Sequence, residues 1–257
     1  MSLSNYRLLA AALREEKPMF KQVALSAILG ITFTATVNGQ INRSFTSEWI
    51  EGREATKAIA RFGDLSPEVI RKRLIQMRQP AYLPGPMLEK KIIESQYLPI
   101  ADGKRIDRLK ASLQPVLDYH ERSRMPVYVL RSEKPKAYLV ESAVLIITTR
   151  IMMIASDEEI RGIVAHELAH EYVREERSRA QEAKNGELMR EYELFCDAVA
   201  AFTLKEIGDD PASYRRILER LTHIGITMGS ATRHESDTHP SLYARKKLNK
   251  FLSRRFD

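Results

Sequence analysis

The chain has 257 residues, 44% of them hydrophobic, which suffices for one domain with a sizeable core plus an extension. Its formal net charge of +7 comes from 41 basic and 34 acidic residues spread along the sequence, and no nucleic-acid-binding motif accompanies them. We therefore expect no nucleic-acid partner. The charge favours an ordinary solvated surface over one that binds an anionic membrane or a cell-wall polymer.

The first 39 residues read as a segment of their own. Gln22–Asn42 carries no charge, and Lys21 precedes an apolar run that ends near Val37-Asn38-Gly39, which suits signal-peptidase cleavage. We expect residues 1–39 to be a cleaved export signal, so that the mature protein is periplasmic or secreted. The alternatives are an uncleaved membrane anchor over residues 19–43 and a buried hydrophobic segment. Hydroxyl side chains in the run make it a weak membrane span.

Residues 40–104 are expected to be an accessory segment that packs against the domain that follows. A short amphipathic helix is predicted at 49–61. Ser66-Pro67-Glu68 opens a second helix, with proline at its first position. Three prolines then indicate a linker or wrapping loop at 79–87.

Residues 105–257 are predicted to form an α+β domain in which helices dominate and the sheet is small. The apolar spacing predicts helices at about 105–121, 156–180, 187–207, 212–228 and 240–254, and a small sheet at about 126–149. His120, which follows the first of these helices, is expected on the surface.

The helix that begins near residue 156 carries the most specific motif of the chain. Ser156 and Glu159 form an S-x-x-E capping box, and apolar residues follow at helical spacing. His166 and His170 are four residues apart and share one helix face, so both imidazoles can reach one metal ion with Glu167 beside them. Two nitrogen ligands and an adjacent carboxylate outline the zinc site of a metallohydrolase.

A third metal ligand is expected on the next helix. With one cysteine in the chain, a cysteine-rich structural zinc site is excluded, and a catalytic zinc ion takes three protein ligands. Glu193 is favoured, because Asp197, one turn later, can accept the second N–H of a ligand histidine and fix its tautomer. Glu191 is the competing candidate. Cys196 is expected to be a small core residue rather than a reactive thiol.

From about Arg105 to the C-terminus the sequence resembles the gluzincin peptidases of the HtpX, Oma and CAAX-prenyl-endopeptidase kind. Three landmarks carry the resemblance in order: His166-Glu167-x-x-His170, Glu193-x-x-x-Asp197, and Thr238-His239-Pro240-Ser241 followed by Arg245. The residues before the histidine helix also resemble the strands of that family. The resemblance implies a zincin-like metallopeptidase domain that acts on proteins or peptides, with envelope protein quality control as one setting and association with the membrane or cell envelope as an expectation.

We expect one zinc ion per chain, bound by His166, His170 and Glu193, with water in the fourth position and its pKa lowered toward ~7. Glu167 is then the general base, which takes a proton from the water and passes it to the leaving amine. The resemblance makes His239 a candidate for holding this water or the developing oxyanion.

One strand of the predicted sheet departs from the family pattern. Family members usually carry Asn-Ala-Phe and a Gly-Gly pair, where this chain has Lys136-Ala137-Tyr138 and Glu141-Ser142. The resemblance implies that this strand binds the substrate backbone by edge addition, so the substrate preference does not carry over. Two other functions stay open: a latent or inactive zinc-binding scaffold or chaperone-like module of the same fold, and a membrane-bound regulatory protein. The sequence leaves the oligomeric state and the natural substrate open.

Overall fold

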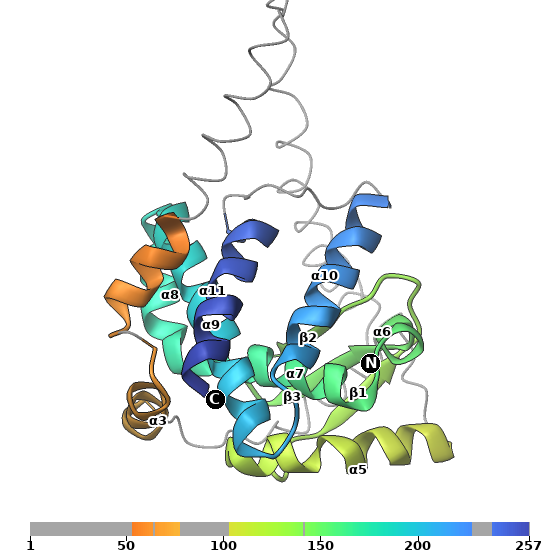
Figure 1. The fold of residues 1–257 in the computed structure, drawn as a ribbon. Helices are drawn as coiled ribbons and strands as arrows, with labels where there is room; N and C mark the ends of the chain where they lie inside the picture. Colours follow the sequence, from red (N-terminus) through yellow and green to blue (C-terminus); the bar gives the residue numbers. More distant parts are fainter. Residues whose placement is uncertain (1–52, 64, 78–102, 141, 228–237, 257) are drawn as a thin grey trace, which may run out of the picture. The chain divides into compact units, whose positions relative to one another are not determined.

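The computed structural model describes residues 53–63, 65–77, 103–140, 142–227 and 238–256. They all belong to the unit that spans Phe45–Asp257. The predicted export signal or anchor at 1–39 and the predicted loop at 79–87 lie outside the described residues. The expected α+β fold dominated by helices is confirmed (Figure 1). No helix in the described ranges is both long and apolar enough to cross a lipid bilayer.

A small sheet is followed by a run of helices, as predicted. The strands are β1 (Val127–Leu130), β2 (Ala137–Val140) and β3 (Val144–Thr148). The helices are residues 53–61, α3 (Pro67–Gln76), α5 (Lys104–Tyr119), α6 (Thr149–Ile154), α7 (Asp157–Ala169), α8 (Arg174–Glu182), α9 (Gly186–Glu206), α10 (Ala212–Thr227) and α11 (Leu242–Phe256), with a 3-10 helix η1 (His170–Val173) between α7 and α8.

The sheet has three strands in the order β1-β3-β2. β1 runs parallel to β3, with Val127 opposite Leu145, and β2 runs antiparallel to β3, with Ala137 opposite Ile147. β3 is buried along its whole length because it lies between the other two strands, whereas β2 is partly exposed. Within this sheet β2 is therefore an edge strand, whose outer backbone groups can pair with another chain.

α7 begins at the predicted capping box. The Ser156 side chain accepts a hydrogen bond from the Glu159 amide, and the Ser156 amide donates to the Glu159 carboxylate at 2.9 Å. The helix packs against α5, α9 and α10 (Figure 1). Gly162 permits a close approach of α10, because a Cβ atom at this position would lie 2.9 Å from the Cβ atom of Tyr214. The missing side chain therefore lets Tyr214 lie against α7, one turn before His166.

The predicted continuous helix over residues 156–180 is wrong in its middle. After α7 the chain makes a turn of 3-10 helix, and only then does α8 begin. Glu171, Tyr172 and Val173, which belong to this turn, are all buried. Val173, at φ −124° and ψ 16°, departs from α-helical backbone angles and separates the 3-10 turn from α8.

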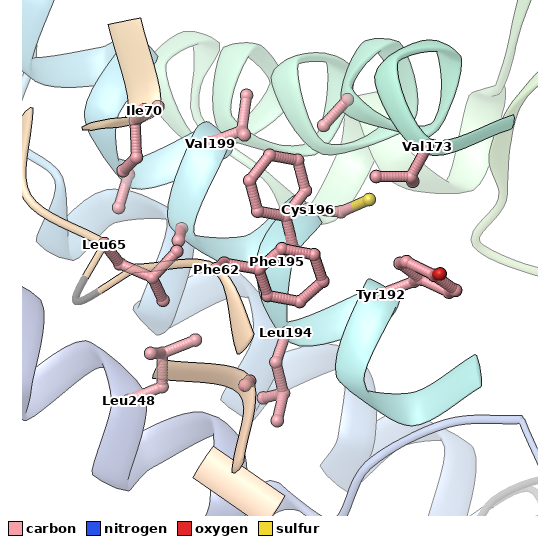
Figure 2. Packing of buried hydrophobic residues seen from close by; sticks show 14 of the residues in the cluster. Phe62, Leu65, Ile70, Val173, Tyr192, Leu194, Phe195, Cys196, Val199 and Leu248 are labelled. Carbon is pink, nitrogen blue, oxygen red and sulfur yellow. The ribbon is translucent and has the colours of Figure 1, made fainter. Parts of the chain in front are cut away.

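α9 belongs to two hydrophobic clusters. In the first, it packs against α3, α11 and the helix before α3, and Figure 2 shows Phe62 beside Phe195. The rings of Phe62 and Phe195 lie 4.7 Å apart. In the second cluster, Ala200 and Leu204 of α9 join the sheet, α5, α7 and α10. The described residues between 53 and 77 thus pack into the first of these clusters.

The expected surface position of His120 is wrong. Its side chain is buried, with only 2% of the residue exposed. The Nδ1 atom lies 2.8 Å from the Tyr172 hydroxyl and the Nε2 atom 3.1 Å from Thr203 Oγ1. Burial of a polar ring is tolerated here because both ring nitrogens have hydrogen-bond partners.

Candidate active site

Three potential metal ligands come together where α7 and η1 lie against α9. His166, His170 and Glu193 each offer one ligand atom, and these atoms lie within 4.8 Å of one another. His166 Nε2 is 3.5 Å from Glu193 Oε2, and His170 Nε2 is 3.7 Å from Glu193 Oε1. Two imidazole nitrogens and a carboxylate oxygen at this spacing fit a zinc ion, and three protein ligands leave one coordination position open.

Glu191, the competing candidate, faces elsewhere. Its buried carboxylate pairs with Arg61 on the helix before α3. Two residues along an α-helix correspond to a rotation of about 200°, so Glu191 and Glu193 point to opposite sides of α9. Glu193 is held instead by Arg177, whose Nη2 atom is 3.4 Å from Oε1, and by Arg245, whose Nη2 atom is 3.5 Å from Oε2.

Asp197 contacts His166, in the manner predicted for a residue that fixes the tautomer of a ligand histidine. Its Oδ1 atom is 3.0 Å from His166 Nδ1, so the ring can donate there while Nε2 faces Glu193. The Tyr214 hydroxyl donates to the same Asp197 oxygen at 2.6 Å and lies 2.7 Å from His166 Nδ1. Arg245 Nη1 donates to Asp197 Oδ1 at 2.8 Å. Buried Asp197 thus joins three side chains from three helices.

Sequence reasoning missed Tyr214 altogether and gave Arg245 no role. Tyr214 stands on α10 with no motif around it, and it reaches the site only because Gly162 lets α10 approach α7. Arg245 was recognised as part of a late family landmark. Its sequence distance of 48 residues from Asp197 gave no sign of direct contact.

Cys196 contacts the second histidine. Its Sγ atom lies 3.4 Å from His170 Nδ1, which is the ring nitrogen opposite the one that faces Glu193. The side chain is fully buried, as predicted for a core residue, and burial raises the pKa of the Cys196 thiol. Each ligand histidine therefore has its Nδ1 atom against a side chain of α9, one against Asp197 and the other against Cys196.

The pKa values of the two histidines diverge. Burial alone would lower the pKa of His166, but hydrogen bonds to Asp197 and Glu193 raise it to about 10. Burial, together with the charge of His166, lowers the pKa of His170 to about 3. Because zinc ligation requires a neutral imidazole, a metal ion and a proton compete for His166.

Glu167 lines the same cleft as both histidines. Burial raises the pKa of this carboxyl group to about 7. A group with a pKa near 7 can both accept and release a proton at neutral pH, which suits a general acid–base. The electrostatic setting of Glu167 thus agrees with the role predicted from the motif.

The cleft has a volume of about 1240 Å³ and is bordered by β2 on one side and by α7, η1 and α8 on the other. His239, just before α11, lines it together with Glu167. His239 is an exposed residue, and its Nδ1 atom lies 2.8 Å from Thr238 Oγ1. His239 therefore reaches the cleft, and its action on a water molecule or an oxyanion stays a prediction.

Asp197→Asn should weaken zinc affinity by about 10- to 100-fold, because the amide is a weaker hydrogen-bond acceptor and would no longer fix the His166 tautomer. Tyr214→Phe should weaken it less, since Asp197 keeps its contact with the imidazole. Competition with a chromophoric chelator measures both affinities. Asp118→Asn, an exposed position on α5, is the matched control. Equal zinc affinity in the parent and in Asp197→Asn would contradict the assignment.

Comparison with known proteins supports the interpretation of this cleft as a metallopeptidase active site. Residues 103–188 match the family model for peptidase family M48. The match covers less than half of the chain. The matched region runs from α5 to the start of α9 and contains the two histidines and Glu167, but it ends before Glu193. The match supports assignment to the M48 metallopeptidases, a zinc-dependent family. No curated protein matched the sequence.

Proposed function

We propose that this protein is a zinc-dependent endopeptidase that hydrolyses peptide bonds in proteins. The observation that carries the proposal is the convergence of His166, His170 and Glu193 in a cleft that also contains Glu167. The match to peptidase family M48 supports metallopeptidase activity in general. The finer kinship to the HtpX, Oma or CAAX-prenyl-endopeptidase kind is part of the proposal.

The chain's own residues supply the proton transfers. When bound, zinc supplies Lewis acidity, which polarises a peptide carbonyl and makes water more acidic. The Glu167 carboxylate accepts a proton as water attacks the carbonyl carbon, and it then delivers that proton to the leaving amine nitrogen. Asp197 and Tyr214 hold the His166 ring in orientation. His239 is the side chain that we assign to the developing oxyanion.

The substrate is proposed to be an extended polypeptide. β2 is the edge strand that borders the cleft in the described sheet, so its outer backbone groups can pair with an extended chain passing the metal centre. Such pairing holds a backbone regardless of its side chains. This supports cleavage within proteins, since the edge strand does not require a chain end.

Digestion of casein tests the proposal directly. The zinc-loaded protein should release peptides, a chelator should stop the release, and added zinc should restore it. Mass spectrometry of the products locates the cleaved bonds. A fully zinc-loaded protein that cleaves neither casein nor a diverse peptide library would overturn the proposal and favour the latent scaffold or chaperone-like alternative.

We also propose that the mature protein acts in the cell envelope, in the periplasm or outside the cell. The support is the uncharged apolar run that follows Lys21, which suits an export signal. N-terminal sequencing of material from the native host tests this. Residues 1–39 should be absent; finding them intact in the membrane fraction would favour an anchor over residues 19–43, and finding them intact in the cytosol would defeat both.

A further inference from the structure

One wall of the cleft is a continuous face of α7, η1 and α8. Its residues recur every three or four positions, as expected for one side of a helical segment. They include Ile163, His166, Glu167, His170, Arg174 and Arg177. Because they follow one another along the chain, the wall has a direction. It begins apolar, passes the metal ligands and ends polar and cationic.

The two ends of the wall differ in chemistry. Beside Ile163 the cleft is lined by Leu218 and Leu221 of α10, which pack with it in one hydrophobic cluster. Beyond His170 the wall instead presents two guanidinium groups, those of Arg174 and Arg177. A peptide that passes the metal centre along this wall therefore meets an apolar environment on one side and a cationic one on the other.

Arg174 is held in place by a network of buried side chains. Its Nη1 atom donates to Ser142 Oγ at 3.0 Å, and that hydroxyl donates to Glu171 Oε1 at 2.6 Å. Ser142 and Glu171 are each only 8% exposed. Ser142 has φ +58°, a left-handed conformation that is uncommon for residues other than glycine. These hydrogen bonds link Ser142, in the turn after β2, to Glu171 and Arg174, which follow His170.

The rest of the Arg174 guanidinium is available to the cleft. The side chain is exposed, and within the described part of the chain it forms no ion pair. Glu171 is the acidic residue at this end of the wall. Its Oε1 atom accepts a hydrogen bond from the Ser142 hydroxyl. The neighbouring Glu175 and Glu176 lie outside the cleft lining. Arg177 differs, because it is half-buried and contacts Glu193.

We propose that Arg174 is a specificity-determining residue that selects substrates with a carboxylate beyond His170 in the cleft. This inference rests on the proposed peptidase function and names its substrate class. A guanidinium presents paired N–H donors that match a carboxylate. Because Ser142 already holds Arg174, less side-chain entropy is lost when the substrate binds. Ser142 and Glu171 are positioning residues, which act through Arg174.

The carboxylate has two sources, an acidic side chain within the peptide or the free C-terminus of the peptide. A peptide series separates them. Its members differ at one position, which carries Glu, Gln or Lys and is scanned along the sequence, and all have amidated C-termini. A free-acid version of the Gln peptide tests the chain end. An internal acidic side chain should be preferred in the amidated series, whereas recognition of the C-terminus should favour the free-acid peptide.

The zinc-loaded parent should cleave its preferred acidic peptide about tenfold faster in kcat/KM than the Gln peptide, which corresponds to one well-formed charged contact. Arg174→Ala should bring this ratio of kcat/KM values close to one. Arg174→Glu should make the Lys peptide the preferred substrate. Arg179→Ala is the matched control, because Arg179 lies on the same helix but outside the cleft lining. An unchanged carboxylate preference in Arg174→Ala overturns the proposal.

Ser142→Ala tests the positioning role. It should lower the carboxylate preference in the parent and have no further effect on that preference in an Arg174→Ala background. A merely structural role for Ser142 would slow the Glu, Gln and Lys peptides equally and leave their ratio unchanged. Glu171→Gln, which keeps an oxygen acceptor for the Ser142 hydroxyl, should retain most of the preference.

A binding measurement separates failure of this inference from failure of the proposed function. Fluorescence anisotropy reports the affinity of labelled peptides for zinc-loaded Glu167→Gln, which is expected to bind without cleaving. If the parent cleaves nothing, yet Glu167→Gln binds carboxylate peptides in an Arg174-dependent way, the peptidase function fails and the selectivity stands. If cleavage occurs and no carboxylate preference is found in rate or binding, the selectivity alone fails.

Discussion

Glu167→Gln should abolish peptide hydrolysis while zinc remains bound and the fold is kept. The amide has nearly the shape of the carboxylate, but it cannot accept a proton from the attacking water. Loss of a general acid–base lowers a rate by about 10²- to 10⁴-fold. Desolvation raises the pKa of this partly buried carboxyl to about 7, which suits such a proton transfer at neutral pH.

The measurement is kcat on a quenched fluorescent peptide at full zinc occupancy, with bound zinc checked by metal analysis. Glu175→Gln is the matched control, since this exposed carboxylate on α8 lies outside the cleft lining. Its kcat should stay near that of the parent on a neutral peptide. Hydrolysis by Glu167→Gln at near the parent rate would show that another group is the base.

Glu193→Ala should leave the purified protein without bound zinc. The substitution removes one of three ligands, and it also leaves Arg177 and Arg245, two cations, beside the site. Both effects act against a divalent ion. The loss of affinity should therefore exceed the 10- to 100-fold change expected when a residue that only supports a ligand is altered.

Metal analysis after dialysis against a weak chelator measures this loss. Glu193→Gln keeps the size of the side chain and separates loss of the ligand from loss of folding, which circular dichroism monitors. Glu191→Ala is the matched control: this carboxylate pairs with half-exposed Arg61, so its removal should leave zinc content unchanged. Zinc retained in Glu193→Gln and lost in Glu191→Ala would reverse the assignment of the third ligand.

The clustering of the candidate ligands could be predicted from sequence because their pattern is local. The capping box at Ser156, the four-residue spacing of the histidines and the spacing of Glu193 and Asp197 each lie within a few turns of one helix, where helical periodicity decides which residues share a face. Only the docking of α7 against α9 had to be assumed, and the structure brings the two helices together.

The supporting contacts were not predictable in the same way, because each joins residues far apart in sequence. Tyr214 reaches His166 across 48 residues, and Ser142 reaches Glu171 across 29. His120 likewise contacts Tyr172, in the 3-10 turn after His170, across 52 residues. Hydrogen bonds to Tyr172 and Thr203 allow His120 to be buried, whereas the local sequence pattern indicated a surface position.

The position of α9 has a thermodynamic consequence. This helix carries Glu193 and Asp197, and its apolar residues contribute to both hydrophobic clusters, so it cannot leave the metal centre without disrupting both. Occupancy of the site is thus coupled to the cooperative unfolding of the whole unit rather than to fraying of one element. An ion that binds only the folded chain adds about 4 kcal/mol to its stability when free zinc is a thousandfold above Kd. Thermal denaturation therefore reports zinc occupancy, with no need for a substrate.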